Sequence, residues 1–157
     1  MASKASMALY CSILGTGSIF PVIITEPTTT INGNEFSIDD ITVSLLRELI
    51  WATKGRVLET SRPGITSDVL DPWKVEIEET TINTKLLKNT ETDIEKVFGG
   101  EKLSIFKSVK KIFPDPESDH IHIIVQAPPP ATTGKCLPMV YLSNKKFALS
   151  HILYFFI

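Results

Sequence analysis

This sequence has few cysteines, no excess of basic residues and no long apolar run. Its 157 residues include two cysteines, Cys11 and Cys136, which lie far apart and predict neither a disulfide framework nor a four-cysteine zinc site. Sixteen Lys and Arg against eighteen Asp and Glu give a formal net charge of −2, so no nucleic-acid partner is expected. The last continuous apolar run, residues 152–157, is far shorter than the roughly 20 residues of a spanning helix. We therefore expect no stable membrane span.

Groups for catalysis are also scarce. Gly15-Thr16-Gly17 and Gly99-Gly100 lack the spacing of phosphate-binding loops and are interpreted as a turn and a helix C-cap. No set of residues suggests a nucleophile, a base and an oxyanion hole acting together. The composition, with 43% hydrophobic and 22% charged residues, is instead typical of one globular domain. We therefore predict no enzymatic activity, no catalytic residue and no cofactor.

The N-terminal part predicts a β-hairpin. Residues 1–6 are small and polar, and the apolar residues 7–14 are interpreted as a first strand that ends at the turn signal of Gly15. Residues 19–25 are expected to form the second strand. The apolar run sits at the short end of what a secretory signal needs, so we predict no convincing signal peptide.

The clearest element is a helix over residues 41–54. Its apolar residues recur at helical spacing, which predicts one buried face. That face is expected to consist of Leu45, Leu46, Leu49, Ile50 and Thr53. Asp39, Asp40 or Thr42 is expected to cap the N-terminus, and Gly55 is expected to end the helix.

Two later strands are predicted over residues 72–77 and 120–126. Pro72 is expected at the start of its strand or on an edge, because proline cannot donate to a ladder. Alternation predicts that the buried sides carry Trp73, Val75 and Ile77 on the first of these strands and Ile121, Ile123 and Val125 on the last. The opposite, open sides carry Lys74, Glu76, His120, His122 and Ile124, which we select as a candidate protein-interaction surface.

Two short helices are expected between these strands. A helix over residues 93–98 is predicted to be capped by Thr90 with Asp93 and to end at Gly99. A helical turn or two is predicted within residues 106–113, just before a proline.

The order of these elements is strand, strand, helix, strand, short helices, strand. This is the order of an α+β fold of the β-grasp (ubiquitin-like) type, a mixed sheet around one main helix, with the final strand parallel to the first in the middle. The connection over residues 26–38 is long and contains the tight-turn pair Asn32-Gly33. Either it is a surface insertion, or residues 35–38 are the second strand; we favour residues 19–25 as that strand.

Metal and thiol chemistry are considered at two places. His120 and His122 could point the same way from one strand, but no third ligand is close in sequence, so no metal site is predicted. Cys11 lies in an apolar strand with nothing nearby to lower its pKa, which favours a buried structural thiol.

Five motifs follow one another from about Met7 to Pro128. The positions that carry them are Leu9, Cys11 and Gly15; Thr42, Val43, Leu46 and Ile50; Trp73, Lys74 and Val75; Leu103 after Gly99-Gly100; and Phe113, Pro114, His120, His122 and Val125. Their order and spacing resemble the N-terminal domain of Crinkler effectors, a family of oomycetes and plant-associated fungi.

This resemblance implies a ubiquitin-like N-terminal domain of a secreted effector that is directed into host cells. In the family this N-terminal domain is associated with export and entry into host cells, and a separate C-terminal domain acts inside the host, often in the nucleus. We therefore expect this domain to mediate delivery and protein interaction, with host partners that the sequence does not name. The alternative is a ubiquitin-like adaptor that works inside the producing cell without secretion. Neither the host target nor the oligomeric state follows from the sequence.

The sequence departs from the family pattern in three places. Pro72 stands where the family usually has leucine, and the segment around Asn32 is inserted. After Pro130 no effector domain is recognised. We therefore divide the chain into an N-terminal extension, the Crinkler-type domain, a proline-rich linker and an apolar tail, at residues 1–6, 7–127, 128–134 and 135–157. The tail is expected either to pack on the domain or to be foreign to it, as in a truncated or misjoined gene.

Overall fold

The computed structural model describes residues 6–129 of the chain. The predicted N-terminal extension (except Ser6), most of the proline-rich linker and the whole apolar tail lie outside the described residues. Within the described part, no helix is long and apolar enough to cross a membrane.

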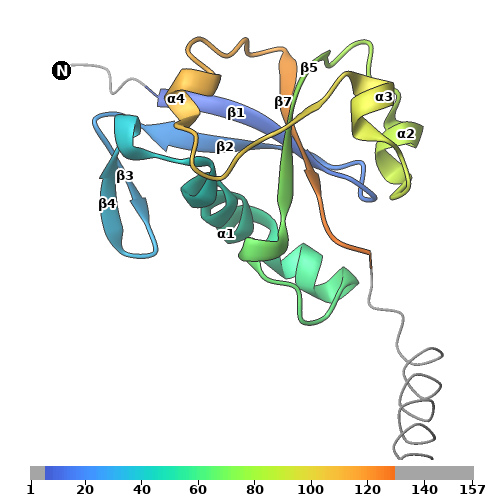
Figure 1. The fold of residues 1–157 in the computed structure, drawn as a ribbon, viewed down its shortest axis with the longest axis horizontal. Coiled ribbons are helices and arrows are strands. Elements are labelled where there is room, and N and C mark those ends of the chain that lie inside the picture. Colours follow the sequence, from blue (N-terminus) through green and yellow to red (C-terminus); the bar gives the residue numbers. More distant parts are fainter. Residues whose placement is uncertain (1–5, 130–157) are drawn as a thin grey trace, which may run out of the picture.

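A five-stranded mixed sheet forms the centre of the domain (Figure 1). Its strands, in spatial order, are β2 (Ile19–Thr25), β1 (Ser6–Ile13), β7 (His120–Gln126), β5 (Asp71–Glu78) and β6 (Glu101–Lys102). The central strands β1 and β7 are parallel, whereas the other neighbours are antiparallel. This arrangement around one long helix confirms the predicted α+β fold of the β-grasp type.

The helix α1 (Val43–Ser61) packs on one face of the sheet (Figure 1). Its fully buried Leu46 and Ile50 join strand residues such as Ile123 and Val125 in the larger hydrophobic core, which we call the α1 core. Burial at this spacing of three to four residues is what keeps an amphipathic helix on a sheet.

The predicted end of this helix was wrong. The helix continues through Gly55, which is buried inside it, and ends at Ser61. A Cβ atom on Gly55 would lie 2.8 Å from the Trp51 ring, so the glycine makes room for that ring. The predicted buried face was also wrong at Thr53, which is exposed, because the buried stripe runs instead from Ile50 to Leu58.

The second face of the sheet is covered as well, contrary to the prediction of an open side. The helices α2 (Thr84–Lys88) and α3 (Ile94–Phe98) supply buried Leu87 and Ile94 to a smaller cluster on this face. Ile124, predicted on an open surface, is 0% exposed in that cluster. A central strand that is covered on both faces has a continuous apolar sequence, and strict alternation then misassigns its sides.

Alternation along β7 also breaks at His122. Ile123 and Val125 belong to the α1 core, as predicted, but Ile121 joins Ile124 in the smaller cluster. The pairing of β7 with β5 shows a register shift between Lys74 and Ile77, at the same level of the sheet. Such an irregularity redirects side chains from one face to the other.

The long connection after β2 folds into a hairpin of its own. Strands β3 (Thr28–Ile31) and β4 (Asn34–Ser37) pair with each other and form a separate two-stranded sheet. Asn32 and Gly33 form its turn with φ angles of 50° and 82°, the left-handed region that these residue types tolerate. Because β2 pairs with β1 along its whole length, the choice of residues 19–25 as the second strand is confirmed.

The short helices differ in detail from the prediction. Asp93, and not Thr90, caps α3 by accepting a hydrogen bond from the Lys96 N–H at 3.1 Å. The helical turn before Pro114 is α4 (Val109–Ile112), and Phe106 lies outside it. Pro72 lies near the start of β5, as expected, where its carbonyl oxygen accepts from the Leu103 N–H.

Candidate functional site

A pocket of about 310 Å³ opens between β5, the segment after α4 and the start of β7. Four of the five residues selected as an interaction surface line it: Lys74, Glu76, His120 and His122. Phe113 and Pro114 form part of its apolar wall. The fifth residue, Ile124, is excluded, because it is buried in the smaller cluster on the other face.

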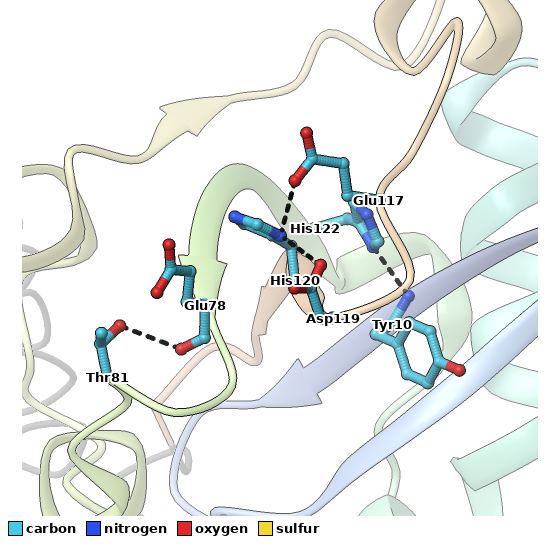
Figure 2. A network of polar contacts seen from close by, with 7 residues as sticks. All are labelled: Tyr10, Glu78, Thr81, Glu117, Asp119, His120 and His122. Atoms are coloured by element: carbon cyan, nitrogen blue, oxygen red, sulfur yellow. Dashed lines mark hydrogen bonds and ion pairs between the residues drawn. The ribbon is translucent and has the colours of Figure 1, made fainter.

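His120 is held between two carboxylates at the rim of this pocket. Its Nδ1 lies 2.9 Å from the Asp119 Oδ1 and 3.1 Å from the Glu117 Oε2, and Figure 2 shows both carboxylates pointing toward this ring. The hydrogen bond to Asp119, assisted by the negative charges around it, raises the pKa of His120 above its ordinary value. The same hydrogen bond lowers the pKa of Asp119. This corner therefore favours a protonated imidazole flanked by two carboxylates.

His122, two residues later, has the opposite environment. Its side chain is buried, and its Nδ1 accepts a hydrogen bond from the Tyr10 N–H at 3.0 Å (Figure 2). Its Nε2 has no hydrogen-bond partner among the described residues. Desolvation lowers the pKa of His122, so the neutral ring is favoured. The prediction that both histidines lie on an open face was therefore wrong for His122.

The bond from Tyr10 explains why His122 is buried. The parallel pairing of β1 with β7 begins at Cys11 and Ile123, one residue further along each strand. The imidazole thus takes the N–H that would otherwise need a backbone partner at the end of this ladder. Its ring also meets the Phe113 ring edge-on, with centroids 6.1 Å apart. The buried ring of His122 therefore forms part of the inner wall of the pocket.

Histidine spacing alone could not separate these two roles. The ligand atoms of Glu117, Asp119 and His120 lie within 4.8 Å of one another, whereas His122 is not part of this group. The two histidines therefore do not form the paired arrangement that was considered for a metal. The prediction of no metal site stays a prediction.

The other lining residues give the pocket a mixed charge. Lys74 Nζ lies 3.4 Å from the Glu76 Oε1 and 5.9 Å from the centre of the Phe113 ring. Carboxylates of Asp115 and Glu117 also border the pocket. The pocket therefore combines the apolar wall of Phe113 and Pro114 with a predominantly acidic rim.

Most family-motif positions support the fold. The buried ones are Leu9, Cys11, Val43, Leu46, Ile50, Val75, Leu103, Phe113, His122 and Val125. Burial raises the pKa of the Cys11 thiol, which agrees with a structural role. Gly15 has a φ of 98°, and Trp73 donates its Nε1–H to the Gln126 Oε1 at 3.2 Å.

A few motif positions remain accessible and lie together. Lys74 and His120 are partly exposed, Pro114 is exposed, and all three line the pocket. They come from distant parts of the sequence and meet because β5 and β7 are neighbours. Thr42, by contrast, is the N-cap residue just before α1, where its side chain forms no capping hydrogen bond, and it lies outside the pocket.

Sequence reasoning missed one feature of this surface. The sequence pattern groups Phe106 with the apolar positions of a helix, but its side chain is 84% exposed. Lys107 and Lys111 line a second depression together with Phe106. No sequence signal reveals this, because the path of the loop depends on bonds to the distant start of α1.

Comparison with known proteins identifies the domain. The family described as the Crinkler effector protein N-terminal domain matches residues 7–126, which agrees with the predicted resemblance. No curated protein and no solved structure matches the chain significantly. The match covers most of the chain, including both sides of the pocket, so the chain belongs to the Crinkler effector family through this N-terminal domain.

Proposed function

We propose that residues 7–126 act as a non-enzymatic N-terminal domain that mediates secretion of an effector and its delivery into a host cell by docking a partner protein. Membership of a family of effector N-terminal domains supports the delivery role. The docking role is supported by the position of Lys74, Pro114 and His120 around one pocket. These motif positions are accessible and contribute little to the core, so stability of the fold alone does not explain them.

The state of two reactive side chains supports a non-enzymatic role. The Cys11 thiol is fully buried and its pKa is raised, so little nucleophilic thiolate forms. The His122 ring already accepts from the Tyr10 N–H, so its Nδ1 is not free to act as a base. A purified chain that turned over a nucleotide or cut nucleic acid would contradict this part of the proposal.

The experiment is a delivery assay with the full chain fused to a reporter. We expect reporter signal inside host cells, and a several-fold lower signal for Lys74→Gln and for His120→Gln, which remove charge at the pocket. Lys85→Gln is the matched control, because Lys85 is exposed on α2, outside the pocket. Thermal unfolding of each variant checks that the fold is retained.

The possible outcomes are distinct. Reporter that stays in the cytosol of the producing cell would overturn delivery and favour the intracellular adaptor. Reporter that reaches host cells equally well with either pocket variant would retain delivery but reject the pocket as the docking site.

A further inference from the structure

A second depression of about 610 Å³ adjoins the pocket and shares Lys74 and Ile112 with it. We call it the basic groove; its further lining includes Leu103, Phe106, Lys107 and Lys111. Phe106 is the most exposed large hydrophobic side chain among residues 6–129. An aromatic side chain displayed beside a groove is typical of a binding surface.

The backbone that presents Phe106 is firmly held. The first N–H groups of α1 need partners outside the helix. Val43 N–H donates to the Lys107 carbonyl at 3.0 Å, and Ser44 N–H donates to the Ile105 carbonyl at 3.1 Å. The Leu103 N–H in turn donates to the Pro72 carbonyl at 3.0 Å. Phe106 is therefore displayed by a preorganised loop, which lowers the entropy lost on binding.

The charges of the two depressions are opposite. The basic groove has three lysines and one acidic residue, Glu101, which lies 3.5 Å from Lys107. Lys111 forms no ion pair within the described part of the chain. The pocket next to it carries Glu76, Asp115 and Glu117. Lys74 stands at the boundary, so the joined surface changes from basic to acidic along its length.

We propose that the basic groove binds a segment of the partner protein that carries an acidic side chain next to a bulky apolar residue. The apolar residue packs on Phe106, and the acidic side chain faces Lys107 and Lys111. This inference rests on the proposed docking function and specifies the chemistry of the partner. A nucleic acid fits less well, because its continuous negative charge would meet the acidic rim of the adjoining pocket.

The experiment is a selection of displayed random peptides on the immobilised full-length chain, followed by measurement of Kd for the recovered peptides. We expect them to share an acidic residue beside an aromatic or large aliphatic one. Lys111→Glu and Phe106→Ser should each weaken their binding by about tenfold or more. The matched controls are Lys85→Glu and Val97→Ser, exposed lysine and apolar residues outside the groove, which should leave Kd unchanged.

Several results would overturn the inference. They are recovery of no peptide, recovery of basic or purely apolar peptides, and equal binding by the groove variants and the wild type. Binding of a single-stranded oligonucleotide in place of peptides would show a nucleic-acid surface. Because Phe106 and Lys111 are exposed, their variants should keep the wild-type unfolding temperature. Normal delivery that depends on His120, together with a failed selection, would reject this inference alone.

Discussion

One face of the sheet is covered by α1, a single helix of 19 residues, whereas α2 and α3, which cover the other face, have five residues each. The α1 core contains buried side chains from β1, β2, β7, α1 and α4, whereas the cluster beneath α2 and α3 is much smaller. Helices of five residues are not stable alone, so α2 and α3 depend on their contacts with the sheet. The two faces should therefore differ in how they respond to a cavity.

The largest effect is expected for Ile50→Ala in the α1 core. Ile50 is 0% exposed and lies in the middle of a long helix that cannot shift without moving its other contacts. We expect the free energy of unfolding to fall by about 3–5 kcal/mol, the upper part of the range for such truncations. Urea unfolding followed by circular dichroism measures this loss.

A smaller loss is expected for Leu87→Ala on α2. Leu87 is equally buried, but its short helix can move toward the sheet and fill part of the cavity. We expect a loss of about 2 kcal/mol under the same conditions. If Leu87→Ala cost as much as Ile50→Ala, the smaller cluster would be as rigid as the main core, and the contrast between the faces would fail.

This contrast also explains what the sequence could reveal. The long helix and the alternating strands carry regular patterns, so the presence of α1 and the parallel central strands could be predicted, but the end of α1 and the side of Ile121 could not. The cover over Ile124 could not be predicted, because α2 is too short for a clear period and the position of α3 on the sheet is set by tertiary packing. Likewise, Lys74, Glu76 and His120 could be selected from alternation. The burial of His122 depends on the N–H of Tyr10, 112 positions away in sequence, and no local pattern encodes it.

His122 lies at the point in β7 where side chains stop alternating between the two faces of the sheet. The pH dependence of stability tests the environment of its ring at this point. The pKa of His122 is lowered in the folded state. His122 should therefore reduce the free energy of unfolding as the pH falls below 6.5, the ordinary pKa of histidine. The folded pKa of His120 is raised, so it should add stability as the pH falls and lose that contribution as the pH rises through its folded pKa. The two effects oppose each other in the wild type.

Single variants separate these contributions between about pH 7.5 and 5.5, the range around an unperturbed histidine. In His120→Gln, stability should fall on acidification with a slope of at most about 1.4 kcal/mol per pH unit, the limit for one proton. In His122→Asn, which keeps an acceptor near the Tyr10 N–H, stability should rise on acidification over the same range. Denaturant titrations at each pH measure both slopes. Equal slopes in the two variants would contradict the opposite environments seen for the two rings.

The smallest expected effect concerns Gly55, where α1 continues past its predicted end. Alanine in a helix interior is normally more stable than glycine by about 1 kcal/mol. Here a Cβ would lie 2.8 Å from the Trp51 Cε2, so the ring would have to leave its place against the helix. Gly55→Ala should therefore destabilise the wild type by about 1 kcal/mol or less, but stabilise a Trp51→Ala background by up to about 1 kcal/mol. A double-mutant cycle measured by urea unfolding gives both values.

A change of the same sign in both backgrounds would mean that Trp51 is not the reason for the glycine. A change of sign would show that this position is reserved for ring packing, which explains why a residue that normally ends helices lies inside the long helix that packs on the main core.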